Sequence, residues 1–325
     1  LPILLYCVHR IVEQTSFEFL DVCEEMNICP VSLFHTNLQN EEINLSYYGV
    51  NPRGVRAMAK ALQYNRKVRR LILTDNFLSD DACYHLNQML QSNVTLKELN
   101  LTGCRIGSSG TRRLIADINI NRALKRLNLA RNNIGDEGGI LIAGQIDRGC
   151  TVKRFNLSNN QLGRPTAMAF TEALMFNDRI TNFDLSRNNF FHIPSTVKML
   201  QELTESQRLH ELNLSWNSLA GERLGEVIKN IMLAPNLMIL DLSHNKFEGE
   251  AVTAIASNLM KAKKLVTLDL SFNPLSPNDA YNLLQKMLRP RVKLVNLLLE
   301  DVRVNKTFPV LLDRVRHMKC QISKL

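Results

Sequence analysis

Apolar residues along the chain recur in one eleven-residue pattern. Leucine or a similar apolar residue stands at positions one, four, six and eleven, and asparagine usually stands at position nine. Eight clear copies follow one another at intervals of 28 or 29 residues, starting at Val68, Leu96, Leu124, Val152, Ile180, Leu209, Leu237 and Leu265. Weaker copies start at Asn40 and Leu294, so the chain holds about ten repeats, which we number one to ten. Such a constant register predicts a repeat architecture.

The residues between successive copies have a different apolar spacing. In 54–62, 82–90 and 251–259, apolar residues return every three or four positions, which is typical of an amphipathic helix. Each repeat therefore predicts a strand, a turn, a helix and a second turn. Neither element can bury its apolar side alone, so neighbouring repeats must stack to close a common core.

The stacking distances predict the form of the assembly. Strands pack about 4.8 Å apart and helices about 8–10 Å apart, so the stack must bend with its strands inside. We expect an α/β solenoid shaped as a horseshoe, with a parallel sheet on the concave face and helices on the convex face. The asparagines at position nine are expected to be structural, because an inward amide can pair with backbone groups of the turning chain.

The two ends of the chain depart from the repeat pattern. We predict an N-terminal helical cap over 1–39, the solenoid over 40–304 and a C-terminal cap over 305–325. A terminal segment has to cover the apolar edge of the first or last repeat. The alternative is that the end segments are helices that bind a partner.

The repeat itself carries a family resemblance. A 28-residue repeat with LxLxxN and a full helix resembles the ribonuclease-inhibitor class of leucine-rich repeat proteins, over about 40–304. Within that class the chain is similar to the group of leucine-rich repeat-containing protein seventy-four, through FLDVCEEMNICPVS (19–32) and EEINLSYYGVNPRGVRAMAKAL (41–62). The resemblance implies the solenoid fold and leaves function open, because one fold serves many functions.

Two features of the class are missing from this sequence. The ribonuclease inhibitor is acidic and rich in cysteine, whereas this chain has a formal charge of +9 and seven cysteines. Binding of a basic ribonuclease is therefore not expected. Members that activate the GTPase Ran have an arginine near the first repeats and a strongly acidic tail. No acidic tail is present here, so no catalytic arginine is assigned.

Composition narrows the class of protein further. The chain has 325 residues, 45% of them hydrophobic, and no apolar run of the about 18 residues that a membrane span needs. The cysteines are scattered and form no C-x-x-C pair, which favours a reducing, cytoplasmic setting. Histidines do not cluster with them, so we expect no metal site and no cofactor.

Strand alternation identifies the residues that face a partner. With positions four and six in the core, positions three, five and seven face the concave side, and position eight lies at the end of the strand. In repeats two to six, positions two, three and eight carry a run of cations. This basic segment consists of Arg69, Arg70, Lys97, Lys125, Arg126, Arg131, Lys153, Arg154 and Arg187. It predicts binding of an acidic partner, and the alternative is a solvated charged edge.

Further along the chain the same positions become apolar and aromatic. Met238 and Ile239 occupy positions two and three of repeat eight. Position eight carries Trp216, His244 and Phe272 in consecutive repeats. Exposed aromatic and apolar residues of this kind dominate the energy of protein interfaces. The alternative is that the rings pack locally over the strand ends.

These patterns predict a non-enzymatic adaptor that binds a protein on its concave face. No P-loop, dinucleotide-binding, metalloprotease or nucleophile-elbow motif occurs in the sequence. One alternative is a structural component of a large cytoskeletal assembly, such as the ciliary axoneme, with location in a cilium or flagellum. Another is a GTPase-activating protein of the Ran type. Nucleic-acid binding is disfavoured because aromatic residues are not interleaved with the cations.

Overall fold

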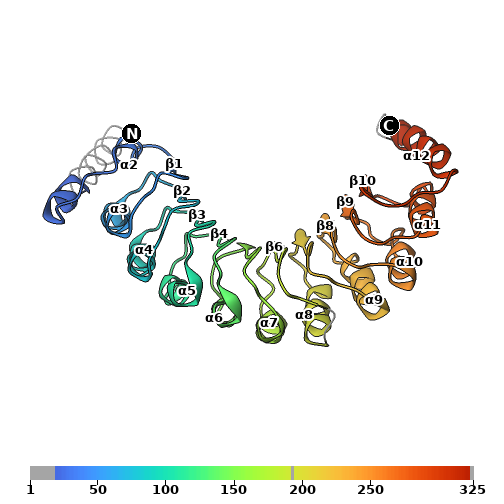
Figure 1. The fold of residues 1–325 in the computed structure, drawn as a ribbon, viewed down its shortest axis with the longest axis horizontal. Coiled ribbons are helices and arrows are strands. Elements are labelled where there is room, and N and C mark those ends of the chain that lie inside the picture. The colour runs from blue at the N-terminus through green and yellow to red at the C-terminus, as the bar shows by residue number, and fades with distance from the viewer. Residues whose placement is uncertain (1–18, 192–193, 323–325) are drawn as a thin grey trace. The chain divides into compact units, whose positions relative to one another are not determined.

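A computed structural model describes residues 19–191 and 194–322 of the chain (Figure 1). The predicted N-terminal cap therefore lies partly outside the described residues, as do Cys7 and the side chain of Cys320. The chain divides into two compact units, residues 1–161 and 162–325, each of which is described by itself.

The first unit contains repeats one to five up to the strand of repeat five. Residues 19–25 are helical ahead of it. The elements that follow are α2 (Ser32–Thr36), β1 (Glu42–Asn44), α3 (Pro52–Tyr64), β2 (Arg70–Ile72), α4 (Asp80–Ser92), β3 (Glu98–Asn100), α5 (Gly107–Ile115), β4 (Arg126–Asn128), α6 (Gly135–Asp147) and β5 (Arg154–Asn156).

The second unit continues the alternation of helix and strand. Its elements are α7 (Arg164–Phe176), β6 (Asn182–Asp184), α8 (Pro194–Thr204), β7 (Glu211–Asn213), α9 (Glu222–Ile231), β8 (Ile239–Asp241), α10 (Gly249–Ser257), β9 (Thr267–Asp269), α11 (Pro277–Met287), β10 (Asn296–Leu298) and α12 (Phe308–Ile322). Helix α12 packs against α11 and buries Leu311 and Val315.

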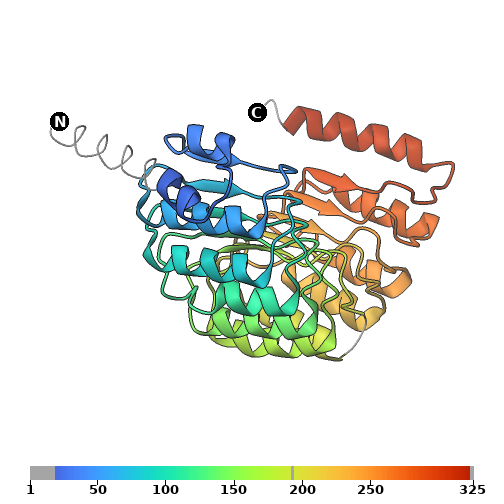
Figure 2. The same cartoon turned by 60° about the vertical axis from the view of Figure 1, so that its left-hand side comes forward.

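Within each unit the strands are parallel and in register at equal positions of the repeat. Leu71 of β2 lies opposite Leu99 of β3, and Leu212 of β7 lies opposite Leu240 of β8. The helices of each unit lie on one side of its strands and run parallel to one another (Figures 1 and 2). The predicted class, an α/β solenoid of strand–helix repeats with a parallel sheet, is confirmed.

Local sequence signals explain where several helices begin. The side chain of Asn51 accepts a hydrogen bond from the Gly54 amide at 2.8 Å, ahead of α3. At α11, Ser276 and Asp279 form a reciprocal capping box, which satisfies backbone donors that the first helical turn leaves open.

The core lies between strands and helices, as the pattern predicted. Positions one, four and six are buried in repeats two to nine, with relative exposures of at most 4%. Apolar residues of the helices, such as Leu86 and Ile255, close the other side of this layer. Each repeat thus buries its leucines against its own helix and its neighbours.

The asparagines at position nine form a buried ladder of amides. Asn245, which is 5% exposed, accepts hydrogen bonds from the amides of Asn217 (3.1 Å) and Leu219 (3.0 Å) of the preceding repeat. Its own amide group donates to the carbonyls of Leu214 and Leu242 at 3.0 and 2.9 Å. The prediction that these residues are structural is confirmed, because they satisfy backbone groups that have no partner in the strand.

Repeat three replaces this asparagine by Cys104. The thiol donates to the carbonyl of Leu73 at 3.0 Å but offers no strong acceptor. The amide of Leu78, which an asparagine side chain would accept, bonds instead to the backbone carbonyl of Cys104 at 3.2 Å. Burial raises the pKa of this thiol to about 11.

Candidate protein-binding surface

The exposed side of the strands in each unit is the candidate functional surface. We call the side chains at positions two, three, five, seven and eight the strand face of that unit. Position five is asparagine or aspartate in most repeats, and its side chain accepts from the amide of position seven. Asp241 accepts from Ser243 at 2.9 Å, and Asp269 accepts from Ser271 at 2.8 Å. These residues first of all fix the chain as it leaves the strand.

Ion pairs neutralise part of the basic segment in the first unit. Arg69 pairs with Glu41 at 3.2 Å, and Arg70 pairs with Glu42 at 2.5 Å. Glu41 and Glu42 belong to repeat one, where the sequence analysis had not counted charges. These two arginines therefore attract an acidic partner less strongly than two arginines without ion-pair partners would.

Two further arginines of this segment have partners in neighbouring repeats. Arg126 pairs with Glu98 at 3.1 Å. Arg131 pairs with Asp75 at 2.6 Å, across the glycine that repeat three has at position eight. Both pairs are solvent-exposed, so each contributes little to stability, but both orient an arginine on the strand face.

In repeats four and five, the strand-face positions hold cations and no aspartate or glutamate. Arg126 lies opposite Arg154 in the sheet, and Lys125 precedes the first of these residues. Partial burial and the charges of Lys153 and Arg122 lower the pKa of Lys125. The strand face of the first unit carries eight cations and four carboxylates, a formal charge of +4. This surplus makes repeats four and five the best place for an acidic group of a partner.

Four position-eight side chains of the second unit stack on one another. The guanidinium carbon of Arg187 lies 4.3 Å from the centroid of the Trp216 ring. The rings of Trp216 and His244 are 3.9 Å apart at 17°, and those of His244 and Phe272 are 4.1 Å apart at 7°. We call these four residues the ring stack. The structure thus brings together residues that the sequence had placed in separate repeats.

The backbone of the ring stack is left-handed. The φ angles of Arg187, Trp216, His244 and Phe272 are 54°, 58°, 52° and 56°. Position eight has a positive φ in every repeat, and this conformation is unfavourable for bulky side chains. The sequence contained a signal for it, because other repeats place Gly103 at this position, or asparagine and aspartate, which tolerate the left-handed region.

The rings of the stack are packed on one another and also partly exposed. They pack against one another, yet Trp216 and Phe272 remain 45% and 41% exposed. At the opposite end of the strands, Met238 and Ile239 are 44% and 39% exposed at the start of β8, and Val295 is exposed at the start of β10. An apolar surface on the strand face of the second unit is therefore open to solvent.

The second unit also carries an acidic row, in which the aspartates of position five are joined by carboxylates of positions three, seven and eight. Its strand face holds six carboxylates and one arginine, a formal charge of −5: Asp184, Glu211, Asp241, Asp269, Glu300, Asp301 and Arg187. Asp241 and Asp269 lie opposite each other on β8 and β9. Burial raises the pKa of Asp241, and the charges of Asp269 and Asp184 add to this rise against hydrogen bonds from Ser243. The two strand faces thus have opposite signs.

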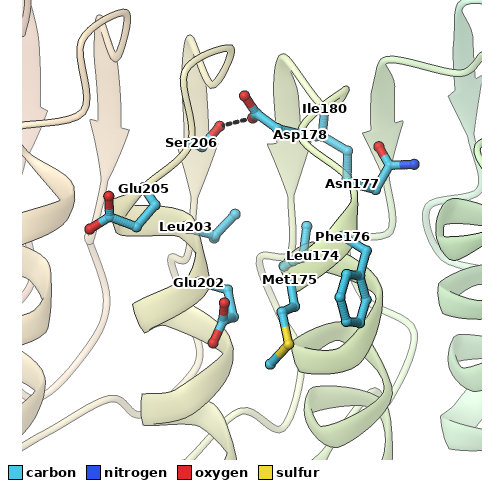
Figure 3. A pocket seen from close by; sticks show the side chains of 10 residues that line it. All are labelled: Leu174, Met175, Phe176, Asn177, Asp178, Ile180, Glu202, Leu203, Glu205 and Ser206. Carbon is cyan, nitrogen blue, oxygen red and sulfur yellow. Dashed lines mark hydrogen bonds between the residues drawn. The ribbon is translucent and has the colours of Figure 1, made fainter.

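A cavity of about 240 Å³ lies away from the strand face, between the ends of α7 and α8 (Figure 3). Met175 and Phe176 line it from α7, and Glu202 lines it from α8. A hydrogen bond of 2.5 Å from Ser206 to Asp178 closes one side. The charged residues that line the cavity are the carboxylates Asp178, Glu202 and Glu205.

Two further features bear on function, a metal-ion site and a membrane-spanning helix. Among residues 19–191 and 194–322, no group of three or more histidines, cysteines and carboxylates is placed to hold a metal ion. In the same part of the chain, no helix combines the length and apolarity that crossing a membrane requires.

Comparison with known proteins agrees with the architecture. A model of the family described as "Leucine Rich repeat" matches residues 92–113, 121–143, 234–256 and 261–284, which lie in repeats three, four, eight and nine. In these four segments the chain is similar to the leucine-rich repeat family, in agreement with its fold.

One solved structure that matches is "Leiomodin-1 Actin-Binding Site 2 (ABS2)". It is 19% identical over 43% of this chain and 82% of that chain, with a TM-score of 0.39. Likeness at this level carries no argument about a shared partner.

Proposed function

We propose that the chain is a non-enzymatic adaptor that binds partner proteins on its strand faces. The observation that carries the proposal is the exposed ring stack, on a strand face that also exposes Met238 and Ile239 at the start of β8. Large apolar and aromatic side chains that solvent can reach are the anchors of protein interfaces. Bulky residues also occupy a left-handed backbone there, at a cost of about 1–3 kcal/mol each, which favours a role outside folding.

The first unit contributes a different kind of contact. Lys125, Lys153 and Arg154 of the basic segment would steer and orient an acidic part of the partner, because complementary charge mainly raises the association rate. The arginines that already form ion pairs in repeats two to four would orient the partner more than they would strengthen its binding. We place the adaptor in the cytoplasm.

The test is an affinity capture from cell lysate, read out by mass spectrometry. The wild-type chain is compared with a variant carrying Lys125, Lys153 and Arg154 changed to Glu, and with Trp216→Ala/Phe272→Ala. The matched control changes three exposed cations of helices α3 and α5, Arg56, Lys60 and Arg113, to Glu. The proposal expects a partner that the control retains and both strand-face variants lose.

A structural component of a large cytoskeletal assembly, such as the ciliary axoneme, is the second candidate. It is favoured by apolar side chains exposed on α7, where Met175 and Phe176 are 56% and 80% exposed. Such a protein would use surfaces other than the strand face. Axonemal proteins or tubulin retained equally by all variants in the capture would favour this candidate. A GTP-turnover assay with Ran tests the third, GTPase activation.

A further inference from the structure

The ring stack of the second unit has two unlike ends. At one end the guanidinium of Arg187 covers the face of Trp216, as a cation over an aromatic ring does. At the other end Phe272 contacts His244 with one face. Within the described residues, no cation or aromatic ring is recorded over its second face. The stack is therefore open at Phe272.

The next residue of the series is too short to close the stack. The amide of Phe272 donates to the carbonyl of Glu300 at 2.8 Å, so the position-eight residue that follows Phe272 along the sheet is Asp301. Asp301 shares the left-handed backbone, with φ of 53°. Asp301 therefore continues the row that the rings occupy in repeats seven to nine, about one strand spacing from Phe272. An exposed ring and an acidic residue thus hold neighbouring places in this row.

The surrounding charge indicates what this end accepts. The strand face of the second unit has a formal charge of −5, and Arg187, its single cation among these positions, lies at the far end of the stack. Asp269 lies one strand from Asp241 on the same face. A cationic group is attracted here, and an acidic group is repelled.

We propose that the strand face of the second unit binds an arginine-bearing apolar segment of a partner protein, whose guanidinium stacks on Phe272 and pairs with Asp301 and Asp269. The new guanidinium would mirror Arg187, so that the three rings lie between two cations. Apolar neighbours of this arginine would rest on Met238, Ile239 and Val295. The inference depends on the proposed protein-binding function and adds the chemistry of the partner.

Arginine fits this end better than lysine for two reasons. Its planar guanidinium lies flat on an aromatic ring, and it offers paired donors to a carboxylate at the same time. An ammonium group is compact and strongly hydrated, so it gains less from the ring face. The site should therefore discriminate between the two cations.

The probe is an amidated pentapeptide of alternating leucine and arginine that carries fluorescein on its N-terminal amine in place of an acetyl group. Binding to the full chain is measured by fluorescence anisotropy at low salt. The matched probe replaces each arginine by citrulline, which keeps the shape and removes the charge. We expect saturable binding of the arginine peptide and at least about tenfold weaker binding of the citrulline peptide, since hydrogen bonds between charged groups have this strength.

Variants of the chain locate the contact. Asp269→Asn/Asp301→Asn should weaken binding at least about tenfold, and Phe272→Ala about fivefold, the effect of one exposed cation–π contact. Phe272→Tyr keeps the ring and should bind within about twofold of the wild type. Asp147→Asn/Asp313→Asn removes two exposed carboxylates on helices and is the control.

The conservative variants keep the test valid if Phe272→Ala fails to fold. Asn156 makes the same hydrogen bond to its position-seven residue as Asp269 does, so the asparagine substitution preserves the turn. No saturable binding, equal binding of the citrulline peptide, or equal binding by Asp269→Asn/Asp301→Asn would overturn the inference. The proposed adaptor function would survive that result if the strand-face variants still lost a partner in the affinity capture.

Discussion

Replacing Asn245 by alanine tests how strongly the buried amide ladder holds the repeats together. The substitution removes the acceptor of two backbone donors, the amides of Asn217 and Leu219. Both groups lie in buried surroundings, so water does not replace the lost side chain. Each unsatisfied buried donor costs about 1–3 kcal/mol, which gives a loss of about 2–6 kcal/mol in the free energy of unfolding.

Cys104→Ala is the matched control at the same position of repeat three. The thiol donates to the carbonyl of Leu73 at 3.0 Å and interacts with the backbone amide of Asn76, and the amide of Leu78 already bonds to a backbone carbonyl. Loss of this side chain removes only weak hydrogen bonds to sulfur, and we expect a cost of about 1 kcal/mol.

The assay is urea unfolding of the full chain followed by circular dichroism, with Trp216 fluorescence as a second probe of the second unit. The reasoning is refuted if Asn245→Ala costs less than about 1 kcal/mol, or if Cys104→Ala costs as much as Asn245→Ala. In either case the hydrogen bonds of the buried asparagines would contribute little to the free energy of unfolding.

Three further outcomes follow from the structure. Phe272→Gly should be about 1 kcal/mol more stable than Phe272→Ala in urea unfolding, because only glycine adopts the left-handed backbone without strain. Asp241→Asn should raise the melting temperature at pH 7, because the raised pKa of Asp241 means that its charged form opposes folding. That gain should shrink as the pH falls through the folded-state pKa, and a gain that is unchanged at low pH would contradict it. Iodoacetamide at pH 8 should label exposed Cys29 but spare Cys83 and Cys104, whose pKa values burial raises to about 12 and about 11; peptide mass mapping reads the result.

The repeat register was predictable because periodicity records burial directly. Position four is buried at Leu71 and Leu240 alike, and position nine holds a buried amide at Asn76 and Asn273. A sequence pattern reports this kind of fact well, since the same apolar environment recurs in repeats two to nine. The positions of the strands and helices within each repeat follow from it.

The ion pairs and ring contacts on the strand faces were harder to predict from the sequence. The pairing of Arg70 with Glu42 depends on which repeats are neighbours and on rotamers, and counting charges in repeats two to five left the partner out. The stacking of Trp216 on His244 requires the left-handed backbone of position eight, which alternation along a strand does not describe.

The sequence aligns Asp184, Asp241 and Asp269 in one column, but the net charge of the surface around them was harder to predict. Asp184, Asp241 and Asp269 share a column with asparagines that do the same structural work, so each reads as a variant of a turn residue. The charge of these three aspartates bears on partner binding because the same strand face also carries the exposed rings and Asp301. The sign of a surface depends on all its columns together.

Site-specific photo-crosslinking tests the central claim most directly. Benzoylphenylalanine is introduced in place of Phe272 on the strand face and, in a second protein, in place of Phe176 on α7, which is more exposed. Both proteins are irradiated in cell lysate and the adducts are identified by mass spectrometry. The account predicts a defined partner adduct from position 272 that position 176 does not give. Adducts from position 176 alone would contradict binding on the strand face.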